Sequence, residues 1–440
     1  MKRSIFLAVF TILLGADFTL AQTEAPSPKV FSLDECIQLA EKYNADLIGA
    51  REYYNQKRSH VWTAWGSLLP RVDSELGYGR RVEGPKSYLY DPATQSYPFG
   101  GTFKWYSAGV SASQSWSLGG YNLFEIREKN ASRNSAKESY ELSRQELVLS
   151  VKQGYFDVLK ASMLLEIQKE ALKRAAEQLK IAETRYELGA ASFSDVLKAK
   201  VQYGDVELAL ISADNALKLA KATLNSWMGQ DVDTPIDVEE NLTMPEFDYS
   251  YEDALKQAIR HNSNLKGAEF DLRSAEAQVG MARSGFFPDF SVYGSYSWLN
   301  EDLDQISHIR KRDYDWNLRA NISFNIFDSF QKNYNLSYAK AYRNSAKENF
   351  HQTKRDVALE LKQAFLNVQE AKEKIELTKK KVKSAEEDLD LVQEKYNLGA
   401  ANILELLDAE VSFKKSESDR IEALYGYNLA VAQFEKAIGK

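Results

Sequence analysis

The chain consists of two copies of one unit, and this tandem repeat constrains its fold more than any other feature. Residues 133–138 (RNSAKE) recur unchanged at 343–348, and 186–191 (YELGAA) match 396–401 (YNLGAA), both at a shift of 210 positions. Nearer the start of each copy the shift is 218, as in Asn44 with Asn262 and Pro70 with Pro288. A fixed offset of this kind indicates duplicated structural units. A single change of offset implies one length difference, which we expect between the strands.

We therefore divide the chain into repeat 1 (22–230), an inter-repeat linker (231–250) and repeat 2 (251–440). Pro235 and Pro245 interrupt the helical pattern within the linker. Residues 1–21 have the pattern of a secretory signal peptide: Lys2 and Arg3 precede a short apolar run, and cleavage is expected after Ala21. The alternative, a membrane anchor, is disfavoured because the apolar run is too short to span a bilayer. Since Cys36 is the only cysteine, an internal disulfide is impossible.

Each repeat carries a long helical hairpin, expected at 121–228 and 331–438. Residues 121–188 contain no proline and one glycine, and near the end of this segment the apolar positions follow a three-four spacing typical of a coiled-coil seam. A helix of roughly 65 residues would be ~100 Å long. Such a length exceeds the needs of a compact domain and predicts an extended object. The returning arm (192–228) is about half as long, and the helix expected at 46–66 supplies most of the difference if the two stack end to end.

Period-2 alternation predicts two strands in each repeat, near 70–80 and 105–118, and near 286–299 and 316–327. Apolar residues at every second position alternate with Ser, Asn and Gly, and Trp and Tyr lie near the strand ends. This pattern is typical of outer-membrane strands, although a half-buried sheet in a soluble protein alternates in the same way. The export signal and the lack of a later apolar run favour the membrane alternative. Four strands cannot close a barrel, for which about eight is the minimum, so the sequence predicts an oligomer, and a trimer would supply twelve strands.

Composition argues against other classes of function. The net charge is −7, and Lys and Arg are scattered among acidic residues, which disfavours a nucleic-acid partner. The four histidines show no metal-ligand spacing, and neither a glycine-rich phosphate loop nor a nucleophile motif is present. We therefore expect no enzymatic activity, no cofactor and no metal site.

These features together resemble the TolC family of outer-membrane factors over essentially the whole mature chain. The resemblance is carried by two tip motifs, 185–199 and 395–409, and by two helix starts, 44–47 and 262–265. It implies a mixed α/β membrane protein in which a homotrimer shares a 12-stranded antiparallel β-barrel, four strands per chain, and a long α-helical coiled-coil barrel. The barrel would lie in the outer membrane lipid, and the helices would form a large periplasmic part.

The resemblance further implies an exit duct of a tripartite efflux pump or a type I secretion system. Such a duct is a passive channel that a periplasmic adaptor and an inner-membrane transporter open. The alternative from a different class is a periplasmic coiled-coil adaptor or scaffold without a membrane-spanning barrel. A barrel-forming chain would fractionate with outer membranes, and an adaptor's sheet would not need Trp, Tyr and Ile facing outward.

The family's gate corresponds to the two hairpin tips at Gly189 and Gly399. Its acidic constriction matches Asp195, Glu405 and Asp408, and the resemblance also assigns Tyr396 to the gate. For Asp195 and Glu405 a helix-capping role competes, because Ser192 and Asn402 stand three positions earlier. Asp408 lies beyond the first turn, where a charged ring is the better interpretation. The best-known relatives carry a locking arginine two residues after the second glycine, and here that position is Ala401.

Overall fold

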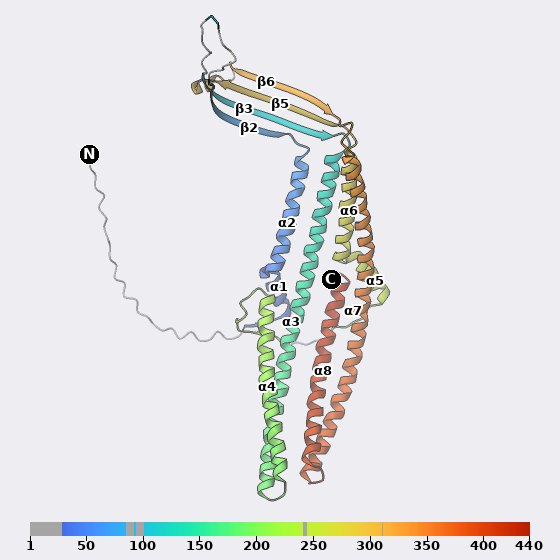
Figure 1. Ribbon diagram of the computed structural model, residues 1–440. Helices are drawn as coiled ribbons and strands as arrows, with labels where there is room; N and C mark the ends of the chain where they lie inside the picture. The colour runs from blue at the N-terminus through green and yellow to red at the C-terminus, as the bar shows by residue number, and fades with distance from the viewer. Residues whose placement is uncertain (1–28, 85–91, 94–100, 241–243, 310) are drawn as a thin grey trace, which may run out of the picture.

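The structure is a computed structural model that describes residues 29–84, 92–93, 101–240, 244–309 and 311–440. The predicted signal peptide lies outside the described residues. The molecule is elongated, with one sheet at one end, helices that run away from it, and two hairpin turns at the opposite end (Figure 1). Within the described residues, no helix is both long and apolar enough to cross a membrane.

The eight α-helices of the described residues follow the same order of lengths in both halves of the chain. Helices of 11, 22, 67 and 35 residues occur first as α1 (Leu33–Tyr43), α2 (Ala45–Gly66), α3 (Tyr121–Glu187) and α4 (Phe193–Trp227). The same lengths return as α5 (Tyr251–His261), α6 (Ser263–Ser284), α7 (Gln331–Asn397) and α8 (Ile403–Ala437). The hairpins expected at 121–228 and 331–438 correspond to α3–α4 and α7–α8.

Helix α4 is continued by α2, end to end, alongside α3. The Asn44 amide at the start of α2 donates to the carbonyl of Trp227 at the end of α4, over 3.2 Å. Gly229, with φ +70°, fits against this junction, since a Cβ there would lie 2.6 Å from the Tyr43 carbonyl oxygen. Repeat 2 has the same arrangement, with Asn262 donating to Ala437 over 3.5 Å and Gly439 (φ +85°) against His261. Helices α4 and α2, stacked end to end, therefore form the partner of the long helix α3, as the helix lengths predicted.

The main sheet contains β2 (Arg71–Val82), β3 (Thr102–Ser117), β5 (Asp289–Asn300) and β6 (Tyr314–Ser323), antiparallel and in that order. The helices beside it follow the matching order α2, α3, α6, α7 (Figure 1). β6 ends four residues before the limit expected from the sequence. The reason is its partner: Ser323 pairs with Asp289, the first residue of β5, and Pro288 before it has no N–H to continue the ladder.

The two faces of this sheet differ in polarity. Register and alternation place one group of largely apolar side chains together: Val72, Leu76, Tyr78, Tyr106, Val110, Trp116, Phe290, Val292, Tyr296, Trp298, Tyr314, Trp316, Leu318 and Ile322. The other face carries mostly Ser, Asn and charged residues, among them Asp73, Glu75, Ser107, Ser111, Ser113, Ser291, Ser295, Ser297, Asn317, Arg319 and Asn321. In the single chain, Leu318 remains 70% exposed on the apolar face.

A second, two-stranded sheet joins the start of repeat 1 to the linker that follows it. β1 (Lys29–Phe31) pairs in parallel with β4 (Ile236–Val238), which lies inside the predicted linker. Ile236 and Val238 are buried in a core shared with α1, α3 and α4. Farther along the linker, Phe247 packs against Phe434 of α8, with ring centroids 4.9 Å apart. The described parts of the linker, 231–240 and 244–250, thus pack against both halves of the chain.

Candidate gate at the hairpin tips

The two hairpin turns lie at the end of the molecule farthest from the sheet (Figure 1). Gly189 and Gly399 have φ values of +74° and +75°, and an added Cβ at either would meet open space. The turn after α3 is closed by Gly189 N–H donating to Tyr186 O and Ala190 N–H donating to Arg185 O, at 2.9 and 2.7 Å. Glycine is required here by backbone conformation, because a left-handed residue ends the helix.

Asp195 caps the N-terminus of α4. Its backbone N–H donates to the Ser192 hydroxyl oxygen over 3.2 Å, and its carboxylate accepts from Ser192 N–H over 3.2 Å, which completes a capping box. The Ser192 hydroxyl also donates to this carboxylate over 2.8 Å, and this bond is the main reason that the pKa of Asp195 lies below its usual range. Lys198 adds an ion pair at 3.7 Å. The capping role weighed from the sequence is therefore realised in the single chain.

Glu405 and Asp408, three positions apart on α8, have different surroundings. Asn402 caps α8 by accepting from the N–H groups of Leu404 and Glu405, and its amide donates to the Glu405 carboxylate over 2.6 Å. Asp408 lies one turn deeper and is exposed. Its carboxylate forms no hydrogen bond or ion pair among the described residues. Of Asp195, Glu405 and Asp408, only Asp408 has a carboxylate that makes no contact with the cap of its own helix.

Tyr396 is buried at the tip of the second hairpin, with 5% of its surface exposed. Its ring packs with Ile403, Leu406 and Leu407, and Ala401 lies against the same cluster. The structure does not bring Asp195 to it: no hydrogen bond joins the two among the described residues. The residue that reaches Tyr396 from the first hairpin is Arg185, which the sequence analysis did not assign to the gate.

Arg185 stands in the last turn of α3 and crosses to the end of α7. Its guanidinium lies 4.4 Å from the centre of the Tyr396 ring. It donates to the carbonyl oxygens of Tyr396 and Asn397, at 3.1 and 3.3 Å. Sequence spacing places Arg185 in the tip motif, but only the packing of α3 against the second hairpin shows which way its side chain reaches.

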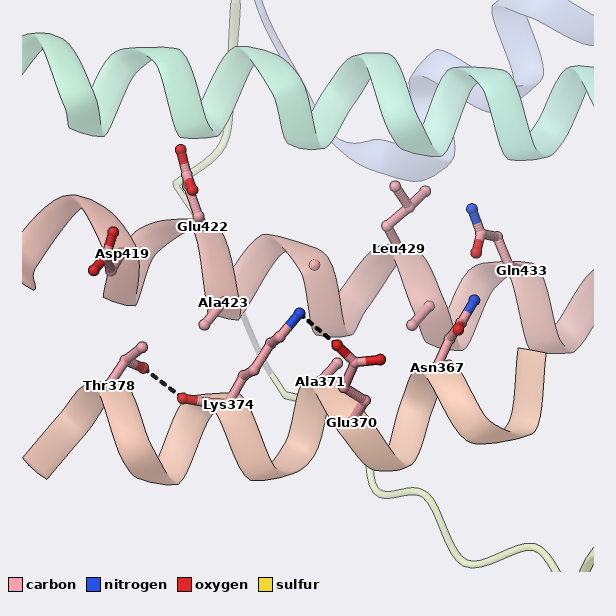
Figure 2. A pocket seen from close by; sticks show the side chains of 12 residues that line it. Asn367, Glu370, Ala371, Lys374, Thr378, Asp419, Glu422, Ala423, Leu429 and Gln433 are labelled. Carbon is pink, nitrogen blue, oxygen red and sulfur yellow. Dashed lines mark hydrogen bonds and ion pairs between the residues drawn. The ribbon is translucent and has the colours of Figure 1, made fainter. Parts of the chain in front are cut away.

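A groove of about 550 Å³ lies between α7 and α8, away from the tips (Figure 2). Ala371, Ala423 and Gly426 are among its lining residues, and Glu370 and Lys374 form an ion pair with each other at 2.7 Å. None of the residues predicted for the gate lines it. In the described part of the chain, His, Cys, Asp and Glu side chains form no group of three or more that could hold a metal ion.

Comparison with known proteins agrees with this architecture. The chain is 22% identical to the outer membrane protein TolC of Vibrio cholerae over 414 residues, which covers 93% of this chain and 90% of that protein. It is 25% identical to TolC of Escherichia coli over 347 residues, covering 76% and 69%. The crystal structure of the Campylobacter jejuni CmeC outer membrane channel shares the fold, with a TM-score of 0.83, 20% identity, and coverage of 92% and 85%.

The family model described as outer membrane efflux protein matches residues 36–230 and 254–440, one match in each half of the chain. These two segments include both hairpins, the four-stranded sheet and the capped tips described above. The chain belongs to the outer membrane efflux protein family.

Proposed function

We propose that three copies of this chain close its four-stranded sheet into one 12-stranded barrel. Among the described residues, the sheet order leaves β2 and β6 as edges, and the outer backbone groups of these two strands have no neighbouring strand. Such edges are unstable in lipid, where water cannot satisfy them, and four strands are too few to close alone. Pairing β2 of one copy with β6 of the next removes every edge. The equal helix lengths of the two halves support a tandem duplication as the origin of this four-strand unit.

The apolar face of the sheet supports contact with outer membrane lipid. Aromatic residues gather towards both ends of the strands, with Trp116 and Phe290 stacked near the helices and Tyr296 and Tyr314 stacked near the opposite end. Rows of aromatic side chains on either side of an apolar band are typical of membrane-spanning barrels. The Ser- and Asn-rich face would then line the lumen.

The chain is a subunit of an outer-membrane exit duct. Its 67-residue helices would reach ~100 Å from the barrel, at 1.5 Å per residue, which suits a conduit through the periplasm. We propose that the hairpin tips meet a periplasmic adaptor and an inner-membrane transporter, in an efflux pump or a type I secretion system. The family assignment disfavours the alternative of an adaptor without a barrel.

The acidic residues at the tips would line a negatively charged constriction of the duct. Three symmetry-related copies of Asp408 would form one ring near the axis, with Glu405 and Asp195 adding charge beside it. The observation that carries this proposal is the exposed and unpaired Asp408 carboxylate. Converging carboxylates repel one another, and a multivalent cation would relieve that repulsion and block the pore.

Asp408→Asn tests the ring, because it keeps the shape of the side chain and removes its charge. We expect lower cation selectivity and weaker block by multivalent cations in single-channel recordings from planar bilayers. Folding should be little affected, since residue 408 lies too deep in α8 to cap it. Asp214→Asn is the matched control, because Asp214 lies on α4 in an ion pair with Lys218 at 2.7 Å. If both variants conduct like the parent channel, Asp408 does not face the lumen.

A further inference from the structure

We infer that Arg185 is the clamp that holds the two hairpins of one chain together and thereby keeps the proposed duct closed. This inference rests on the proposed channel function and assigns its regulation to a residue outside the acidic constriction. The family's locking position is occupied here by Ala401, whose side chain has no polar group. At the tips, the Arg185 side chain instead extends from repeat 1 to the end of α7 in repeat 2.

The geometry of Arg185 suits a clamp because one side chain makes two kinds of contact with the same helix end. The guanidinium stacks over the Tyr396 ring at 4.4 Å, a cation–π arrangement. Its N–H groups also donate to two carbonyls at the C-terminus of α7, where the helix dipole favours a cation. The Tyr396 carbonyl additionally accepts from the Gly399 N–H over 3.1 Å.

Neighbouring contacts extend this connection up the same side of α3. The Gln178 amide donates to the side-chain oxygen of Gln393 on α7 over 3.0 Å, and Ile181 packs against the cluster that contains Tyr396. Opening would require the hairpins to separate, so all of these contacts would have to break. Arg185 lies closest to the tip, where separation would begin.

Within one chain, the equivalent residues of the two repeats make different contacts, so the clamp is asymmetric there. Tyr186 stands where Tyr396 does in the second repeat, yet Tyr186 is 46% exposed and Tyr396 only 5%. Tyr186 packs on Phe193 within its own hairpin, with ring centroids 5.5 Å apart. Lys395 occupies the position of Arg185 and is exposed. The repeat therefore supplies a matched control at the same helical position.

The test uses the full-length protein in planar bilayers. Arg185→Ala should raise the resting open probability about tenfold, the size of shift produced by losing about 1.4 kcal/mol of preference for the closed state. Arg185→Lys keeps the charge but loses the planar stacking and paired donors, so an intermediate rise is expected. Lys395→Ala should behave like the parent. Tyr396→Leu should raise the open probability as well, and adding it to Arg185→Ala should have little further effect, because both remove one contact.

The outcomes separate this inference from the channel function itself. If the parent protein forms gated channels and Arg185→Ala leaves the resting open probability unchanged, Arg185 is not the clamp. If Lys395→Ala opens the channel as strongly, the effect is one of charge at the tip, and the clamp is wrong. If Arg185→Ala fails to assemble, the resting open probability of Arg185→Lys decides instead: a rise supports the clamp, and no change contradicts it. A parent protein that never conducts would contradict the proposed function instead.

Discussion

Replacing Leu318 by arginine should prevent the protein from accumulating in the outer membrane. Leu318 lies in the middle of β6 on the apolar face, opposite Gly294 and 70% exposed in the single chain. If this face contacts lipid, an arginine near the bilayer midplane costs about 2–4 kcal/mol per chain, and a trimer carries the change three times. Membrane fractionation followed by immunoblotting of the folded, heat-sensitive oligomer would measure the loss.

Asn317→Arg is the control for this result, because Asn317 is the next residue of the same strand and points to the polar face. A lumen-facing arginine remains hydrated, so this variant should reach the outer membrane at close to the parent level. Equal loss from both variants would show that the strand tolerates no arginine on either face. Loss from Asn317→Arg alone would reverse the assignment of the two faces.

Gly229→Ala should be strongly destabilising, by about 2–3 kcal/mol. Its φ of +70° lies in the left-handed region, which costs a residue with a Cβ about 1–2 kcal/mol. The new Cβ would also lie 2.6 Å from the backbone oxygen of Tyr43, so the junction between α4 and α2 would have to shift. Gly439→Ala should have a similar effect at the equivalent junction of repeat 2, where the Cβ would lie 2.8 Å from His261 backbone atoms.

Gly204→Ala gives the comparison for these junction variants. Gly204 lies within α4, and a Cβ there meets open space, so alanine should be neutral or stabilise by up to about 1 kcal/mol. The apparent unfolding midpoint of each detergent-purified variant, followed by circular dichroism at one scan rate, would measure the difference. Similar midpoints for Gly229→Ala and Gly204→Ala would show that the end-to-end stacking of α4 and α2 is not a close contact.

The long elements were predictable because their signals accumulate over many residues. The 67-residue helices carry a sustained three-four spacing, and the strands carry period-2 alternation, so both types of element were placed within a few residues. The same patterns occur in both halves of the sequence, so each type of element was predicted from two independent segments. The capping of α4 by Ser192 and Asp195 was also readable, since it depends on residues only three positions apart.

Short elements, and contacts between residues far apart in the sequence, could not be predicted in this way. β1 and β4 have three residues each, too few for any periodicity, and they exist because residues some 200 positions apart meet. α1 was not predicted, although Ser32 and Glu35 form a capping box at its start, a signal that the sequence does contain. The contact of Arg185 with Tyr396 depends on how one hairpin packs on the other. The sequence gives no direct measure of that packing, and the family pattern pointed to residue 401 instead.

The mass of the folded protein in detergent tests the proposed trimeric barrel most directly, because a barrel to which each chain gives four strands would have to be shared between chains. Protein extracted from outer membranes in mild detergent should be weighed by native mass spectrometry, with circular dichroism to verify that it is folded. The shared 12-stranded barrel predicts a particle of three chains and no folded smaller species. A stable, folded particle of one chain would contradict it.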